Sequence, residues 1–387
     1  MRRLTTALGL PQHRFASVHV VGTNGKSSVA RMTAALLEAH GLRAGASLSP
    51  HLTRWSERTL IGGEQVGEED WAEAVTRVAA AAEGVNRSLG PGEAVTQFEA
   101  ATAASFLALA RARVEVVAVE AGLGGRLDAT NTIPSRLTVL TSVGLDHTEW
   151  LGKSELEIAA EKLAVLRDQS TLVLAGVSPA VAALAARVAA ERGARLVEAP
   201  ADPGPELRLR ALGSYQRRNF AIGAAAAAVF LGELDPARVA AVADSLTVPG
   251  RLERIATGPD AYVDAAHNPD GAAALAASLP AVADGRRVVG CLAVLADKDA
   301  AAMAAALAPA LDAAVCTELR AAARPTHDAA ELAAACAAAG IAATVEPDFG
   351  AALRRATELA AADPEGIVLV TGSHYAIGPA RDCARMG

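Results

Sequence analysis

Short runs of β-branched and other apolar residues alternate with longer amphipathic stretches along much of the chain. Such runs are typical of buried strands, and the longer stretches have the period of helices. In the first part of the chain the predicted strands are 17–21, 114–120, 137–143 and 171–175, and the predicted helices are 28–40, 155–166 and 179–190. This alternation predicts an α/β fold in which helices cover a mostly parallel sheet.

A second series of strands and helices follows Pro249 and Gly250, which together break regular structure. Its predicted strands are 261–264, 288–294, 313–317 and 367–371. A chain of 387 residues exceeds the size at which one hydrophobic core usually stops growing. We therefore predict two α/β domains, spanning residues 1–246 and 247–387.

The overall charge and the cysteines narrow the range of partners and compartments. A formal net charge of -7 gives no general basic field for nucleic acid, so an anionic substrate requires a local site. The 4 cysteines include no closely spaced pair, which favours a reduced protein. We see neither a signal peptide nor an apolar run of about 18 residues. A cytoplasmic protein without a membrane or nucleic-acid partner is expected.

A phosphate-binding loop is the sharpest local signal, because strand 17–21 runs through a glycine-rich turn into helix 28–40. The turn consists of Gly22, Thr23, Asn24, Gly25, Lys26, Ser27 and Ser28. Glycines let backbone N–H groups converge on phosphate oxygens, and a lysine neutralises their charge. Either Ser27 or Ser28 could supply a hydroxyl to Mg²⁺. The alternative is a structural turn with a solvated lysine.

Polar residues also follow the next two predicted strands. Glu120 ends strand 114–120, and His147 comes shortly after strand 137–143. The carboxyl ends of strands in an open α/β sheet are where ligands bind, so both residues are candidate Mg²⁺ ligands. A cap or a satisfied polar group is the competing interpretation for each. Lys162 lies on helix 155–166, and its spacing alone predicts an exposed lysine.

The second predicted domain has its own polar residues at strand boundaries. Arg251 precedes strand 261–264, and Asp264 and His267 stand at its end and just beyond it. Arginine could pair with phosphate, the carboxylate could accept from a ribose or orient water, and the imidazole could stack on a base. We interpret His374 as a structural turn residue.

Taken together, these motifs resemble the folylpolyglutamate synthase and dihydrofolate synthase family, within the Mur ligases. The matching segments are 19–26 (HVVGTNGK), 49–52 (SPHL), 57–58 (ER), 98–99 (FE), 120–131 (EAGLGGRLDATN), 144–147 (GLDH), 161–162 (EK), 250–253 (GRLE), 264–269 (DAAHNP) and 371–373 (TGS). The resemblance extends over nearly the whole chain. It implies a Mur-ligase-like ATP-binding domain containing the phosphate loop and a parallel sheet, plus a smaller Rossmann-like α/β domain at the C-terminus.

The resemblance also implies a reaction. ATP would activate a carboxylate of a reduced folate or a dihydropteroate as an acyl phosphate, and the amine of L-glutamate would displace the phosphate. The implied cofactors are ATP and Mg²⁺ at two sites, and the family suggests a monomer. The sequence leaves open which acceptor is used and how many glutamates are added.

Residue roles follow from the same resemblance. Lys26, His147 and Lys162 would be catalytic, and nucleotide contacts would come from the loop and from Asn219, Arg251, Asp264 and His267. Metal contacts would come from Ser27, Ser49, Glu120, His147 and Lys162. The lysine matching Lys162 is carbamylated in many relatives, which turns it into a carboxylate.

Three features depart from the family pattern or leave alternatives open. Ser27 stands where a glycine is common after the loop lysine, and residues 163–165 (LAV) replace the usual Ala-Gly-Ile. The segment before the loop is shorter than usual, and in the family that region helps to frame the folate site.

The competing functions are another Mur-type ligase that acts on a cell-wall precursor, and a nucleotide-binding protein without catalysis.

Overall fold

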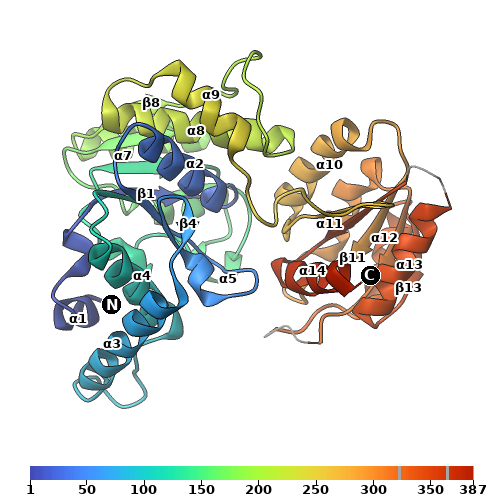
Figure 1. The fold of residues 1–387 in the computed structure, drawn as a ribbon, viewed down its shortest axis with the longest axis horizontal. Coiled ribbons are helices and arrows are strands. Elements are labelled where there is room, and N and C mark those ends of the chain that lie inside the picture. The colour runs from blue at the N-terminus through green and yellow to red at the C-terminus, as the bar shows by residue number, and fades with distance from the viewer. Residues whose placement is uncertain (321–323, 363–365, 387) are drawn as a thin grey trace. The chain divides into compact units, whose positions relative to one another are not determined.

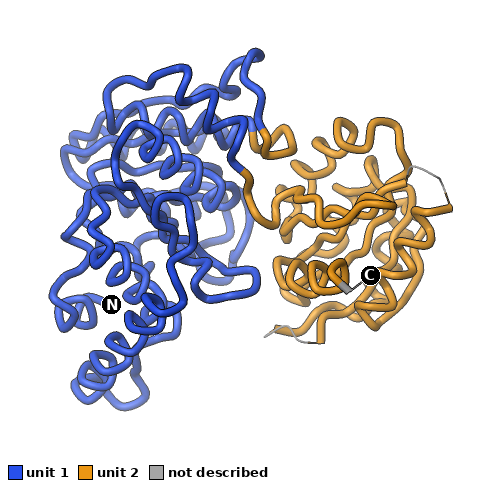
Figure 2. The backbone as a smooth tube through the Cα atoms, viewed as in Figure 1, with its two compact units in different colours: residues 1–209, 217–246 blue, residues 210–216, 247–387 orange. Residues whose placement is uncertain are grey.

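The computed structural model describes residues 1–320, 324–362 and 366–386. The chain forms two compact units, coloured separately in Figure 2: residues 1–209 with 217–246, and residues 210–216 with 247–387. We propose that they correspond to the two predicted domains, with segment 210–216 grouped with the second. Among the described residues, no helix has the length and apolar character needed to cross a bilayer.

The first unit is built on an eight-stranded sheet with the order β4-β3-β2-β5-β1-β6-β7-β8. Its strands are β1 (Ala16–Val21), β2 (Ala44–Ser47), β3 (Thr59–Ile61), β4 (Glu64–Gln65), β5 (Val116–Glu120), β6 (Leu137–Leu140), β7 (Thr171–Leu174) and β8 (Arg195–Glu198). The strands from β2 to β8 in this order run parallel, as predicted, whereas β3 and β4 add an antiparallel edge.

Helical segments connect these strands (Figure 1). They are α1 (Arg2–Ala7), η1 (Pro11–His13), α2 (Lys26–Ala39), η2 (Trp55–Arg58), α3 (Glu68–Asn86), α4 (Gln97–Arg111), η3 (Ala129–Thr132), α5 (Thr148–Leu151), α6 (Glu155–Leu163), α7 (Pro179–Glu191), α8 (Ser214–Leu231) and α9 (Pro236–Ser245). Residues 214–216 of α8 belong to the second unit, and the rest of the helix belongs to the first.

The direction of each crossover decides which face of the first sheet a helix covers. The chain moves one way from β1 to β2 through α2, and the opposite way from β2 to β5 and from β6 to β8. Because parallel crossovers are right-handed, α2 lies on one face, and α4, α6 and α7 lie on the other. Burial agrees with this assignment: Phe106 of α4 packs with Val117 and Val119 of β5, and Leu163 of α6 packs with Leu140 of β6.

The second unit contains a six-stranded sheet with the order β13-β12-β11-β14-β10-β9. Its strands are β9 (Glu253–Ala256), β10 (Asp260–Val263), β11 (Val288–Leu292), β12 (Ala313–Cys316), β13 (Ala342–Val345) and β14 (Ile367–Thr371). Its helical segments are α10 (Pro269–Ala283), α11 (Ala300–Leu307), η4 (Ala308–Ala310), α12 (Ala329–Ala338), α13 (Phe349–Ala361), η5 (His374–Ala376) and α14 (Ile377–Met386). Of these six described strands only β9 pairs antiparallel, so the predicted α/β class is confirmed for both units.

Candidate active site

Strands β1, β5 and β6 lie side by side in the centre of the first sheet and end at the same edge. From β1 the chain moves to one side, toward β2, and from β5 it crosses over β1 to reach β6. This reversal is a topological switch point, where the loops after the strands separate and leave room for a ligand. The loops that carry the predicted residues of the first unit leave the sheet here.

The phosphate-loop candidate is held by the segment that follows β6. The backbone N–H of Thr23 donates to the carbonyl of Ser142 at 3.0 Å, and the N–H of Asn24 donates to the Ser142 hydroxyl at 2.8 Å. The hydroxyl of Thr141 donates back to the Asn24 carbonyl at 2.6 Å. These bonds fix the loop before any ligand binds, which lowers the entropy lost on binding.

Glycine is required in this loop by both conformation and space. Gly25, with φ of 83°, is the residue from which α2 starts. A Cβ atom there would lie 2.6 Å from Oδ1 of Asn219, and a Cβ on Gly22 would lie 2.0 Å from the hydroxyl of Thr141. The predicted residue Asn219 therefore packs against the loop from α8. The Lys26 ammonium donates to the Thr23 carbonyl at 3.0 Å, so the lysine folds over the same loop.

Glu120 connects two other predicted residues. Its carboxylate, at the end of β5, accepts from the hydroxyl of Ser27 at 2.8 Å and from the backbone N–H of Ser49 at 2.9 Å. Glu120 is only 3% exposed, and Ser28 is buried in α2, whereas Ser27 is partly accessible. The structure thus groups Ser27, Ser49 and Glu120 beside the phosphate loop, and Ser27 is the loop serine that faces the carboxylate.

The spacing of Lys162 predicted an exposed lysine, and this prediction is wrong. Its side chain is buried, with only 3% exposed. Its ammonium donates to the carbonyl of Gly22 at 2.9 Å. Burial first, and then the positive charge of Lys26, lower the pKa of Lys162 to about 7, although Asp146, Asp128 and Glu161 act in the opposite direction. The helical period could have revealed this position, because Lys162 lies four residues after Ile158, which is fully buried.

His147 begins the short helix α5 in a left-handed conformation with φ of 52°. Its backbone N–H donates to the carboxylate of Asp146 at 2.9 Å, and its Nε2 lies 3.9 Å from the same carboxylate. Asp146 was not singled out from the sequence, nor was Asp128, whose carboxylate accepts from the N–H groups of Gly122 and Leu123. Both acids favour the charged form of Lys162, and only the fold brings them near it.

Metal binding at this edge has to be judged by the kind of ligand present. Among residues 1–320, 324–362 and 366–386, no three His, Cys, Asp or Glu side chains gather as a ready-made metal site. Mg²⁺, however, commonly uses one or two carboxylates together with substrate phosphates and water. The buried carboxylate of Glu120 beside the hydroxyl of Ser27 fits that requirement.

In the second unit, the predicted residue Asp264 is buried, and its carboxylate is already hydrogen-bonded within the protein. Its carboxylate accepts from the Tyr215 hydroxyl at 2.6 Å and from the N–H groups of Leu252 and Ala266, each at 2.8 Å. Burial raises the pKa of Asp264, while Arg251 and these donors act against that rise. Asp264 therefore fixes the segment that carries Arg251. The sequence did not point to Tyr215, because several helices and strands separate it from Asp264 along the chain.

His267 is oriented by its own backbone, since its Nδ1 donates to the carbonyl of Ala265 at 2.9 Å. Its ring meets that of His374 edge-on, with centroids 6.3 Å apart, and His374 in turn lies 4.0 Å from the ring of Tyr375. His374 begins the short helix η5, which agrees with its interpretation as a turn residue. The predicted nucleotide residues thus fall into a group around the loop in the first unit and a group within the second.

Comparison with known proteins identifies the family. Residues 250–374 match the family model for the Mur ligase, glutamate ligase domain. The dihydrofolate synthase/folylpolyglutamate synthase of Mycobacterium tuberculosis is 37% identical over 352 residues, which cover 81% of this chain and 72% of that protein. The chain belongs to the folylpolyglutamate synthase/dihydrofolate synthase family.

Solved structures of this family agree over nearly the whole chain. Folylpolyglutamate synthase of M. tuberculosis, complexed with ADP and AMPPCP, is similar with a TM-score of 0.92 and 32% identity, and covers 99% of this chain and 94% of its own. A bifunctional folylpolyglutamate synthase/dihydrofolate synthase with Mn, AMPPNP and L-glutamate bound gives a TM-score of 0.84 at 28% identity, covering 99% and 94%. The predicted Mur-ligase-like fold is confirmed.

Proposed function

We propose that this protein is an ATP-dependent ligase that joins L-glutamate to a carboxylate of a reduced folate or a dihydropteroate. The carboxylate oxygen attacks the terminal phosphorus of ATP, which gives an acyl phosphate and ADP. The amine of L-glutamate then attacks the acyl carbon, and phosphate and a proton leave as the amide forms. Membership of the family supports this reaction, and so do the nucleotide, Mn and L-glutamate found with solved relatives.

One observation carries the proposal: the buried carboxylate of Glu120 joins Ser27 of the phosphate loop to the backbone of Ser49. We assign Ser27, Ser49 and Glu120 to a Mg²⁺ site, with His147 near a second one. When bound, Mg²⁺ neutralises phosphate charge and polarises the transferred phosphoryl group. Glu120 is held by two hydrogen bonds in advance, so little reorganisation is needed to present its charge.

The loop itself supplies the phosphate contacts. Lys26 provides a positive charge, and the loop from Gly22 to Ser28 leads into the N-terminus of α2, whose dipole favours anions. The side chain of Asn219 packs against the turn at Gly25. We assign Arg251, Asp264 and His267 to the nucleotide as well, with Asp264 acting by holding the segment of Arg251 in place.

Lys162 has the properties needed for carbamylation. A pKa of about 7 leaves a substantial fraction of its amine uncharged near neutral pH, and only the uncharged amine reacts with CO₂. The ammonium first loses one proton; the neutral nitrogen then forms a bond to the carbon of CO₂ and loses a second proton, so a cation becomes an anion next to the Gly22 carbonyl and the loop. That change supplies the additional carboxylate which a second Mg²⁺ requires.

The test measures ADP release by the purified protein with ATP, Mg²⁺ and L-glutamate. Dihydropteroate, tetrahydrofolate and no acceptor are compared, with Lys26→Ala as the inactive control. Release that depends on one pterin and is lost in the variant supports the proposal and names the acceptor. Release that requires a cell-wall precursor instead would move the assignment to another Mur-type ligase, and no acceptor-dependent release at all would contradict a ligase function.

A further inference from the structure

A cavity of about 570 Å³ lies in the first unit away from the loops described above. Its lining includes Arg136, which directly precedes β6, and Arg167, which lies just before β7. These residues stand at the amino-terminal edge of the sheet, whereas the phosphate loop and Glu120 follow strands at the carboxyl edge. The cavity is therefore separate from the candidate active site. Its volume is in the range of small-molecule pockets.

The lining of this cavity carries more positive than negative charge. Arg2, Arg136 and Arg167 line it, and within the described part of the chain neither Arg2 nor Arg136 forms an ion pair. Arg167 uses Nη2 to donate to the carbonyls of Asn131 at 2.9 Å and Ile133 at 3.2 Å, so its charge is not neutralised by an acid.

The acidic residue in the cavity lining does not neutralise the positive charge of these arginines. Asp168 lines the cavity but is paired with Arg192 at 3.0 Å. The guanidinium of Arg2 helps to lower the pKa of Arg167, after burial and Arg192, which shows that the positive charges act on one another. In a chain of net charge -7, this is a local concentration of positive charge rather than a general property.

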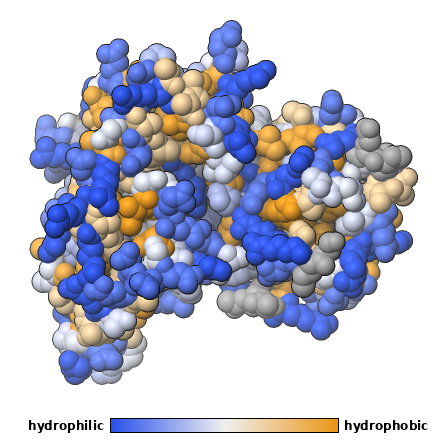
Figure 3. All heavy atoms as spheres, in the orientation of Figure 1, coloured by the Kyte–Doolittle hydropathy of each residue, from blue (hydrophilic) through white to orange (hydrophobic). Residues whose placement is uncertain are grey.

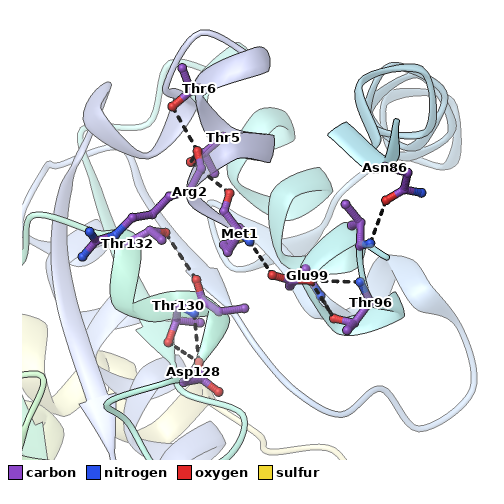
Figure 4. A network of polar contacts seen from close by, with 12 residues as sticks. Met1, Arg2, Thr5, Thr6, Asn86, Thr96, Glu99, Asp128, Thr130 and Thr132 are labelled. Atoms are coloured by element: carbon purple, nitrogen blue, oxygen red, sulfur yellow. Dashed lines mark hydrogen bonds and ion pairs between the residues drawn. The ribbon is translucent and has the colours of Figure 1, made fainter. Parts of the chain in front are cut away.

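A buried polar side chain in the cavity lining also has an atom without a hydrogen-bond partner among the described residues. Gln12 lines the cavity and is only 2% exposed, yet its Oε1 has no hydrogen-bond partner among the residues the structure describes. A buried acceptor without a donor costs about 1–3 kcal/mol. Figure 4 shows Arg2 with Thr5, Thr6 and Thr132 nearby, and these three threonines line the same cavity as Arg2.

We propose that this cavity binds a small oligoanion that carries carboxylate or phosphate groups together with a hydroxyl or amine donor. Planar guanidinium groups pair with both kinds of oxyanion through parallel hydrogen bonds. The donor of the ligand satisfies Oε1 of Gln12. Binding at this site is independent of the proposed ligase reaction, because it uses none of the residues assigned to ATP or Mg²⁺.

The test is calorimetric titration of the full chain with citrate and, separately, with tripolyphosphate. Both titrations are done at a saturating concentration of ADP and without added Mg²⁺, which both probes would chelate, so that the phosphate loop is already occupied. Arg136→Gln is compared with Arg187→Gln, an exposed arginine on α7 whose side chain is 69% accessible. We expect Kd to rise at least about tenfold in Arg136→Gln and to stay within about twofold in Arg187→Gln.

The two probes distinguish the source of the anion. Binding of citrate alone indicates a carboxylate ligand, binding of tripolyphosphate alone indicates a phosphate ester, and either result supports the site. Gln12→Met gives a second check that does not depend on arginine: the melting temperature of the free protein should rise, and probe binding should weaken. Absence of binding by both probes, or binding that is unchanged in Arg136→Gln, would overturn the proposal.

Discussion

Replacing Lys162 by methionine should change how the stability of the first unit depends on pH. In the wild-type protein the pKa of this amine falls from 10.5 to about 7 on folding. At about 1.4 kcal/mol per pKa unit, keeping the buried amine charged costs roughly 5 kcal/mol below pH 7. Methionine removes the charge with a similar chain length, although it leaves the Gly22 carbonyl without this donor, at a cost of about 1 kcal/mol.

The direction follows from proton linkage. Between pH 7 and 10.5 the unfolded chain holds a proton on Lys162 that the folded chain has lost, so wild-type stability rises with pH in this window. The cost is fully present below pH 7 and is relieved as pH approaches 10.5. The methionine variant lacks this contribution. It should therefore be more stable than wild type at pH 6 by several kcal/mol, and the advantage should disappear by pH 10.

The assay is urea unfolding in CO₂-free buffer from pH 6 to 10, followed by a signal from the first unit. Lys153→Met serves as the matched control, because Lys153 is exposed just before α6. Its stability should follow wild type at every pH. A constant difference between Lys162→Met and wild type over the whole range would refute the assignment of a depressed pKa to this lysine.

Three further substitutions test the loop and the second unit. Gly25→Ala should weaken ATP binding at least about tenfold in a binding titration, because Gly25 has a left-handed backbone and a Cβ atom there would meet Asn219 of α8. Gly41 is also left-handed but faces open space, so Gly41→Ala should leave the affinity for ATP unchanged. Ser27→Ala should lower kcat/KM by about 10- to 100-fold and raise the Mg²⁺ concentration required; if Ser28→Ala did so instead, the hydroxyl assignment would be wrong. Tyr215→Phe should destabilise the second unit by about 1–3 kcal/mol in thermal unfolding, and an unchanged melting temperature would show that its bond to the buried carboxylate is dispensable.

The loops around the candidate site also leave apolar groups exposed. Leu127, which follows β5, is 84% exposed, and Trp150 in α5 is 73% exposed. Figure 3 shows hydrophobic residues scattered among mainly hydrophilic ones on the visible face. Single exposed apolar side chains are normal on protein surfaces. We therefore assign no role to these two residues.

Local sequence was sufficient for much of the fold. The apolar runs that became β1, β5, β6 and β7 were recognisable because strands buried on both faces are continuously hydrophobic. The β3–β4 hairpin was missed because two short strands at an open edge, one of them entirely polar, have no such run. The phosphate-loop candidate could be predicted because its glycines, lysine and serines all lie within residues 22–28, so their geometry depends on few neighbours.

The sequence by itself determined the α/β class, the family and the residues that follow the central strands, since each depends on short-range order along the chain. Only the tertiary structure decided that Lys162 is buried against Gly22, that Ser27 rather than Ser28 faces Glu120, and that Tyr215 holds Asp264. Burial and electrostatic environment arise from contacts between segments far apart in sequence. The pKa of Lys162 and the cavity beside Arg136 are properties of that packing: the helical period can mark Lys162 as buried, but it does not say which groups surround it.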